Sequence, residues 1–253
     1  MSRYQSILHP DYIRYQAFID SLPVCFDQEG TIIYNSRNQV RLFVVGGETL
    51  VVKRYKIPMF HQCVAYTWFR PSKARRAYLF GLRLLEAGID TPKPVACIEE
   101  YHCGLFRVGW FVSSYCPDAN ARSLRDDVHP DPNLLSAIAQ CLVRMHEHGI
   151  LHGDTNLSNF LYREDASETF GYHITTIDVN RSTFKESLSV DDCARNLCRL
   201  THVRPLLQDL ITCYASIRNW NADDLSARVF HYLSNFEKKR FFKRLKKRIF
   251  SNK

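Results

Sequence analysis

The sequence has no apolar run approaching the roughly 20 residues that a membrane-spanning helix needs. Its first residues also lack the apolar stretch of a secretory signal peptide. Nine cysteines are present, but their number is odd and no C-x-x-C pair occurs. These absences argue against a disulfide-stapled or exported protein, and we expect a cytoplasmic protein with reduced thiols.

The composition supports a folded core, because 45% of the 253 residues are hydrophobic and 24% are charged. This length fits one large domain or two lobes. The formal net charge of +8 is not spread over the chain: residues 237–253 carry nine Lys/Arg and one Glu, and the remainder is neutral. The basic character therefore belongs to the C-terminal segment.

The first half of the chain is rich in strand patterns with one helix among them. The helix is predicted between a Ser72 N-cap and a stop at Gly88. Gly46 and Gly47 mark a tight hairpin turn. The predicted strands, rich in β-branched and aromatic residues, cover 30–34, 39–45, 49–55, 95–99 and 105–114.

The second half is predominantly helical. An amphipathic helix ends at Gly149, strands are predicted at 160–163 and 173–178, and helices follow from Ser189. The order predicts an α+β, bilobal, protein-kinase-like fold with a β-rich N-lobe and a helical C-lobe. The predicted lobes and C-terminal tail are 1–114, 115–237 and 238–253.

The strongest chemical signal is the segment His152-Gly153-Asp154 with Asn159 five residues after the aspartate. In phosphoryl transfer, such an Asp orients a substrate hydroxyl and accepts its proton, while the Asn oxygen ligates Mg²⁺. A second carboxylate is then needed for the metal, and Asp178 follows an apolar strand. Lys53 stands on the third predicted strand, where a lysine would contact the nucleotide phosphates.

Each of these residues alone is weak as a signal, because a strand lysine is usually solvated and a strand-ending aspartate usually belongs to a turn. Their order along the chain, on the expected elements, is what favours a kinase. The predicted catalytic set is Asp154, Lys53, Asn159 and Asp178, with Asn159 and Asp178 as metal ligands.

The segment from Met145 to Asn159, together with Asp178-Val179-Asn180-Arg181, resembles the lipopolysaccharide core kinases, which phosphorylate Kdo or heptose. Ser72–Tyr78 and Leu84–Pro92 are also similar to that family, and the resemblance covers about residues 30–200. It implies ATP and Mg²⁺ as co-substrate and metal. It also implies that Asp154 is the base, that Asn159 and Asp178 hold the metal, and that Lys53 contacts phosphate.

Several residues depart from the protein-kinase pattern. Gly153 replaces the arginine that reads a phosphorylated activation loop, which favours a small-molecule or glycolipid kinase over a signalling enzyme. The loop 35–38 has no glycine, so Arg37 is predicted to contact the phosphates in place of a Gly-rich cover. In the helix after Lys53 the only acidic residue is Glu86, at its end, so the sequence names no glutamate partner for this lysine.

The strand ending at Ser113 predicts a hinge at Ser113, Ser114 and Tyr115, whose backbone would meet adenine. His146, His148 and His152 lie near Asp154, but no fourth ligand has metal-site spacing, so we expect packing roles for them. A basic group with Arg70, Lys73, Arg75 and Arg76 either binds an anion near a helix N-terminus or forms a solvated helix face.

The tail 238–250 combines eight basic residues with Phe241, Phe242, Leu245 and Ile249 on one helical face. This pattern predicts a helix at an anionic membrane surface. A helix capping the C-lobe and a nonspecific nucleic-acid contact are the alternatives. Nucleic acid is the less favoured partner, because the body of the chain carries no basic stripe.

The sequence therefore predicts an ATP- and Mg²⁺-dependent kinase, cytoplasmic and peripheral on the inner membrane. Its acceptor would be a sugar hydroxyl, of Kdo or heptose, in a lipid-linked lipopolysaccharide core. Two alternatives remain: a soluble small-molecule kinase of the aminoglycoside or choline kinase type, and a catalytically inactive kinase-like binding protein. The first usually binds cationic substrates through acidic pockets, and the lack of an acidic C-terminal half counts against it. The second is favoured by the missing helix glutamate and disfavoured by the intact Asp154, Asn159 and Asp178.

Overall fold

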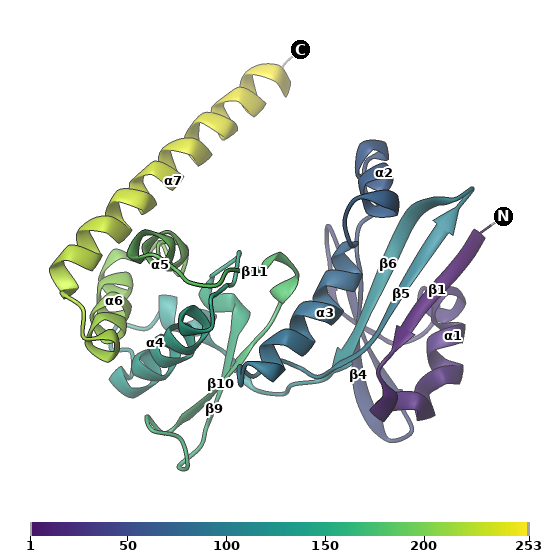
Figure 1. Ribbon diagram of the computed structural model, residues 1–253, viewed down its shortest axis with the longest axis horizontal. Helices are drawn as coiled ribbons and strands as arrows, with labels where there is room; N and C mark the ends of the chain where they lie inside the picture. Colours follow the sequence, from purple (N-terminus) through teal and green to yellow (C-terminus); the bar gives the residue numbers. More distant parts are fainter. Residues whose placement is uncertain (1, 252–253) are drawn as a thin grey trace. The chain divides into compact units, whose positions relative to one another are not determined.

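The computed structural model describes residues 2–251, without the side chains of residues 246–251. It divides into two compact units, one of Met1–Pro117 with Ile177–Arg181 and one of Asp118–Thr176 with Ser182–Lys253. The short segment Ile177–Arg181 thus belongs with the first unit although the chain around it belongs to the second (Figure 1).

The first unit is built on a six-stranded antiparallel sheet in the order β1-β5-β6-β4-β3-β2. Its strands are β1 (Ser2–Leu8), β2 (Thr31–Asn35), β3 (Gln39–Val45), β4 (Glu48–Arg54), β5 (Pro94–His102) and β6 (Leu105–Ser114). Its helices are η1 (Pro10–Tyr15), α1 (Gln16–Cys25), α2 (Phe60–Trp68), α3 (Lys73–Glu86) and η4 (Val179–Arg181).

Both faces of this sheet are covered. The alternation of side chains along a strand sends Leu50 and Val52 into a core that is shared with α1 and η1. On the opposite face, Ala74 and Ala77 of α3 pack against Cys97 of β5. Figure 1 shows α3 lying along the sheet.

The predicted strands and the α3 helix are confirmed. Residues 39–45 and 105–114 form strands with the predicted ends, and Ser72 caps α3 by accepting a hydrogen bond from the Arg75 backbone N–H. Gly88 adopts the left-handed conformation that ends such a helix.

The prediction of a single helix in this half was wrong, because α1 and α2 are also present. Neither has a side-chain hydrogen bond at its N-cap, and α1 contains Pro23 within its last turn. Helices without a capping residue and with an internal proline carry few local signals, so their positions depend on tertiary packing.

The second unit is mostly helical. Its helices are η2 (Ala121–Arg125), α4 (Pro132–Glu147), η3 (Leu157–Asn159), α5 (Val190–Leu197), α6 (Arg204–Arg218) and α7 (Ala222–Ser251). Two small antiparallel sheets complete it, formed by β7 (Ala119–Asn120), β9 (Phe160–Glu164) and β10 (Tyr172–Thr176), and by β8 (Ile150–Leu151) and β11 (Thr183–Phe184).

The core of the second unit lies around α4, which packs against α6 and β10. Ile138, Leu142 and Met145 of α4 are fully buried, and burial of each such side chain contributes about 2 kcal/mol to folding. The long helix α7 packs its first half on α5 and α6 and then continues past them (Figure 1). Within residues 2–251, none of the helices has the length and apolar character required to traverse a membrane.

Candidate active-site residues

Lys53 is placed by the alternation of strand β4. Because Leu50 and Val52 enter the core on one face, Lys53 and Tyr55 lie on the face that α3 covers. The Lys53 ammonium lies 2.7 Å from Oδ1 of Asp178 and 5.2 Å from the centre of the Tyr55 ring. The first unit therefore brings together the predicted phosphate-contacting lysine and one predicted metal ligand.

Asp178 lies beyond the strand that was predicted to end with it. Strand β10 ends at Thr176, and Asp178 has a φ of 60°, in the left-handed region that Asp tolerates better than most residues. The Asn180 amide donates to Oδ1 of Asp178, which is the oxygen that contacts Lys53. Helix η4, which follows directly, packs against α3. A strained turn thus holds the carboxylate over the sheet face that carries Lys53.

The carboxylate partner of Lys53 was not found in the sequence because it was sought in the following helix. Glu86 is the last residue of α3, and Lys53 pairs with Asp178 instead. A different carboxylate near α3, that of Glu99 on β5, is buried and lies 2.7 Å from the Arg75 guanidinium. Lys53 is therefore paired with Asp178, a predicted metal ligand. The face of α3 beside this pair is basic.

The loop after α4 depends on glycine. Gly153 has a φ of 71°, and Gly149 has a φ of 69°. A Cβ at Gly149 would collide with the backbone oxygen of Lys185. An arginine at residue 153 would be strained in the left-handed conformation. The backbone path of this loop is therefore a second reason for glycine at this position, besides the lack of need for an arginine that binds a phosphorylated activation loop.

Hydrogen bonds within the loop fix the Asp154 backbone and the Asn159 side chain. The Asp154 N–H donates to Nδ1 of His152 at 3.3 Å, and the Asn159 Nδ2 donates to the Asp154 carbonyl at 2.8 Å. Because its Nδ2 is used in this way, the amide oxygen of Asn159 is turned away from that carbonyl. An oxygen presented like this is a ligand type that Mg²⁺ accepts.

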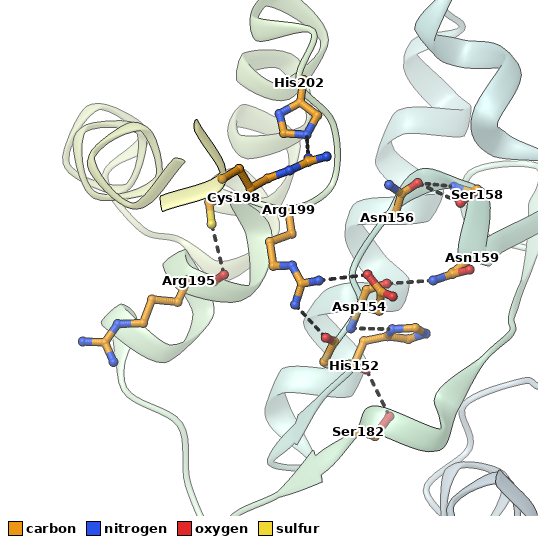
Figure 2. Close-up of polar contacts among 12 residues, drawn as sticks. His152, Asp154, Asn156, Ser158, Asn159, Ser182, Arg195, Cys198, Arg199 and His202 are labelled. Carbon is orange, nitrogen blue, oxygen red and sulfur yellow. Dashed lines mark hydrogen bonds and ion pairs between the residues drawn. The ribbon is translucent and has the colours of Figure 1, made fainter. Parts of the chain in front are cut away.

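Arg199 holds the Asp154 carboxylate, as Figure 2 shows. Its two terminal nitrogens donate to the Gly153 carbonyl at 2.7 Å and to Oδ1 of Asp154 at 2.9 Å. The backbone bond from the Leu157 N–H to the Leu200 carbonyl, at 3.0 Å, joins the same two segments. The guanidinium also lies 5.6 Å from the centre of the Phe236 ring on α7.

Sequence reasoning missed Arg199, and no local pattern marks it. It follows α5, and 45 residues separate it from Asp154. Only the packing of the α5 end against the catalytic loop brings the two together.

Side chains of η2 and of its N-cap residue also form hydrogen bonds with the loop. The Asn120 amide donates to the Ser158 carbonyl at 3.0 Å, and the Arg125 guanidinium donates to Oδ1 of Asn156. That same oxygen accepts from the Ser158 hydroxyl at 2.8 Å (Figure 2). The loop is therefore preorganised by side chains on both sides of the Asp154–Asn159 pair.

Arg37 lies in the β2–β3 connection and borders a hollow of about 480 Å³ within the first unit. At the predicted hinge, the Ser114 N–H donates to the Lys93 carbonyl and the Tyr115 N–H to the Thr49 carbonyl. Adenine at this end of β6 would therefore have to use groups other than these two amides. The adenine-binding roles of Ser114 and Tyr115 stay predictions.

Among the histidines near the loop, His146 is packed in the core. His146 is buried between the Tyr214 hydroxyl and the Asn196 amide oxygen, at 2.8 and 3.0 Å. Burial lowers the pKa of His146 to about 4, which is partly offset by the Asn196 hydrogen bond. Among residues 2–251, no group of three or more His, Cys, Asp or Glu side chains is placed to hold a metal ion.

The antiparallel sheet with its covering helix, followed by a mostly helical second unit, is the element order of a protein-kinase-like fold. The model of the lipopolysaccharide kinase (Kdo/WaaP) family matches residues 45–222, which is more than half of the chain. The chain belongs to this family, and it is a kinase that acts on a hydroxyl group. No curated protein matches the chain.

The similarity to one solved structure supports this fold. WaaP in complex with acyl carrier protein is similar over 93% of this chain and 97% of that chain, with 18% identity and a TM-score of 0.63. The Rio2 kinase ADP/Mg²⁺-phosphoaspartate complex from Chaetomium thermophilum has a TM-score of 0.48 and 17% identity, over 83% of this chain and 65% of that chain. The similarity to WaaP confirms the predicted α+β, protein-kinase-like fold.

Proposed function

We propose that this kinase transfers the γ-phosphoryl group of ATP to a sugar hydroxyl of the lipopolysaccharide inner core, on Kdo or heptose. Family membership supports the class of acceptor. The observation that carries the assignment of roles is the Asp154 loop, in which a carboxylate is fixed at both its backbone and its side chain. A general base has to be oriented in this way before it can select one hydroxyl.

In the proposed reaction, Asp154 accepts the hydroxyl proton as the sugar oxygen forms its bond to the γ-phosphorus. The bond between that phosphorus and the bridging oxygen breaks, and ADP leaves with the electron pair. The Arg199 guanidinium pairs with Oδ1 of Asp154, so that the second carboxylate oxygen is the one offered to the acceptor. Arg199 is therefore a positioning residue.

Mg²⁺ would neutralise charge on the β- and γ-phosphates. The oxygens of Asn159 and Asp178 suit it, because carboxylate and amide oxygens are the ligands this cation prefers. Lys53 would place its ammonium against the phosphates, exchanging Asp178 for the nucleotide. Lys53 and Asp178 thus neutralise each other before the nucleotide binds. The nucleotide phosphates would then replace Asp178 beside Lys53, and Mg²⁺ would replace Lys53 beside Asp178.

Membrane association at the cytoplasmic face is proposed through the end of α7. Phe241, Phe242 and Leu245 have 64%, 61% and 43% of their surface exposed, so these side chains do not cap the helical unit. They alternate with basic residues along the helix, the combination that binds at an anionic lipid interface. Ile249, predicted for the same face, lies outside the residues whose side chains are described.

The membrane proposal is tested by vesicle flotation. The wild type should float with vesicles that contain anionic lipid. With zwitterionic vesicles it should stay in the bottom fraction of the gradient. Phe241→Ser with Phe242→Ser should reduce flotation at least tenfold, whereas Val44→Ser, at an equally exposed apolar residue in the first unit, should not. Equal flotation of all three proteins would contradict this role of α7.

The substrate proposal is tested on the acceptor itself. Mass spectrometry of the lipid A-core should show one phosphate fewer per molecule when the gene is deleted, and its return on complementation. With purified protein, Mg²⁺ and ATP, the deletion-strain core should gain that phosphate. A core of unchanged mass in both experiments would contradict an inner-core acceptor.

A further inference from the structure

A group of five basic side chains gathers at the start of α3, and we call it the α3 basic cluster. Its members come from four separate segments of the first unit: the β2–β3 loop, the residues before α3, α3 itself and η4. They are Arg37, Arg70, Lys73, Arg76 and Arg181. Lys73 and Arg76 lie one turn apart on the same face of the helix.

Lys73 lies within electrostatic reach of the other four cations. Its side chain is partly buried at the N-terminus of α3. The pKa of Lys73 is lowered from its ordinary value first by burial and then by the positive charges of Arg37, Arg181, Arg76 and Arg70. The main charge contributions to this shift therefore all come from cations. Mutual repulsion of this kind is unfavourable unless an anion relieves it.

Within the described part of the chain, no ion pair with a carboxylate is formed by Arg37, Lys73 or Arg76. The Nε of Arg76 is buried and has no hydrogen-bond partner. The Arg70 guanidinium donates to the Tyr66 hydroxyl and lies over the Tyr66 ring. Arg75, the neighbour of Arg76 on α3, pairs with Glu99 at 2.7 Å, although its Nε also has no hydrogen-bond partner. A buried donor without a partner is unfavourable, so Arg76 has a donor available for a ligand that accepts hydrogen bonds.

The cluster lies beside the Lys53–Asp178 pair. Tyr55 connects them: its ring contacts the Lys53 ammonium, and its pKa is raised by burial and by the Asp178 charge and lowered by Arg76. Tyr55 and Lys73 also line one small cavity. Because α3 packs on η4, the cluster and the turn that carries Asp178 form one continuous surface of the first unit.

We propose that the α3 basic cluster binds a phosphate or carboxylate group of the acceptor, so that the enzyme selects a sugar that already carries an anionic group beside the hydroxyl to be phosphorylated. This rests on the proposed kinase function. The positive end of α3 adds to the attraction, since the helix is 14 residues long. Arg37 of the β2–β3 loop, which the sequence predicts to contact the nucleotide phosphates, is reassigned to the acceptor anion by this proposal.

The same chemistry fits a second source, the γ-phosphate of ATP. The two sources predict different kinetics. A site for the acceptor changes the KM for the acceptor, whereas a site for the nucleotide changes the KM for ATP. Lys53 already provides the nucleotide with a cation on the sheet face, so we assign the cluster to the acceptor.

The test uses the full chain with Lys73→Gln and Arg76→Gln, each alone, and Arg83→Gln as a matched control on the exposed side of α3. With purified inner-core acceptor, Lys73→Gln and Arg76→Gln should raise the acceptor KM at least tenfold. The KM for ATP should stay within twofold of the wild type, and Arg83→Gln should change neither. A rise in the KM for ATP alone, or no change in either constant, would overturn the proposal.

A second arm identifies the group that is recognised. An acceptor whose carboxylates have been reduced and phosphates removed should bind the wild type as weakly as it binds Arg76→Gln. If the wild type still bound this neutral acceptor more tightly than Arg76→Gln does, the cluster would not recognise an anion.

A third arm separates this proposal from the proposed function. Inorganic phosphate should raise the melting temperature of the wild type more than that of Arg76→Gln, with both proteins starting from similar values in phosphate-free buffer. If no core sugar is phosphorylated but this difference is seen, the anion site stands and the acceptor assignment fails. If transfer occurs and phosphate stabilises both proteins equally, the anion site fails and the kinase function stands.

Discussion

The two units position their functional groups by different means. In the first, Lys53 sits on a regular strand, and the sheet alternation alone decides which face it occupies. In the second, Asp154 and Asn159 lie in a loop that is shaped by left-handed glycine and by side-chain hydrogen bonds. The strand alternation alone positions Lys53. The loop residues depend instead on specific hydrogen bonds, some of them with residues distant in sequence.

The units also differ in how their charges are balanced. Around α3 the cations outnumber the carboxylates, and several have no partner among the described residues. In the Asp154 loop a single carboxylate is matched by a single guanidinium, Arg199. A surplus of positive charge suits the binding of anionic ligands, whereas a matched pair suits the fixed orientation of one base. This contrast predicts different consequences for mutations in the two units.

In the first unit, the largest effect is expected at the Lys53–Asp178 pair. Lys53→Met and Asp178→Asn should each lower kcat/KM for ATP by about 10²–10³, because each removes a charge that stabilises the transferring phosphoryl group. Steady-state transfer assays at saturating acceptor measure this. Lys53→Arg keeps the charge and should retain more activity than Lys53→Met. A loss below tenfold for both neutral variants would remove this pair from the proposed machinery.

A pH-dependent loss of stability is expected in the second unit. His146 is buried with a pKa near 4, whereas the unfolded chain has the ordinary value of about 6.5. Between these values the unfolded state binds the proton and the folded state does not, so stability falls as the pH falls. The full loss is about 3 kcal/mol near pH 4.

Urea unfolding at pH 7 and at pH 4.5, with His146→Gln as the comparison, tests this expectation. The variant should be less stable than the wild type at pH 7 but should lose less on acidification. An identical pH dependence for His146→Gln and wild type would contradict the assignment.

The smallest effect is expected at Arg199, which acts through Asp154. Arg199→Gln should lower kcat about tenfold, or about 1.4 kcal/mol, and leave the KM for ATP unchanged. Arg199→Lys should recover part of the activity, because a single ammonium can still pair with the carboxylate but cannot bridge to the Gly153 carbonyl. The split between kcat and KM is the decisive readout, because a residue that only positions the base changes kcat and leaves both KM values unchanged. A fall in activity that Arg199→Lys does not partly restore, or that comes with a lower melting temperature, would indicate only a structural role.

Much of the first unit could be predicted from the sequence because its signals are local. Strand alternation, the Gly46–Gly47 turn and the Ser72 cap each involve neighbouring residues, and the structure confirms the elements they mark. Helices α1 and α2 could not be predicted in the same way. They have no capping side chain, and α2 presents apolar residues such as Phe60 and Trp68 to solvent, so its pattern matches neither a buried nor an amphipathic helix.

The candidate site residues also differ in whether local sequence signals mark them. The Asp154–Asn159 spacing is visible in sequence because both residues belong to one short loop. The pairing of Lys53 with Asp178 joins residues 125 apart, and Arg199 reaches Asp154 across 45. Such contacts arise from the topology of each unit, which the local pattern does not encode.

The account rests on Asp154 as the base of phosphoryl transfer, and one variant tests this directly. Asp154→Asn keeps the size of the side chain and its backbone hydrogen bonds but cannot accept the hydroxyl proton. Transfer to the core acceptor and Mg²⁺-dependent ATP affinity should be measured on the same preparation. We predict a loss of transfer of about 10²–10⁴ with ATP affinity within threefold of the wild type. Transfer close to the wild-type rate would contradict the assignment of the base.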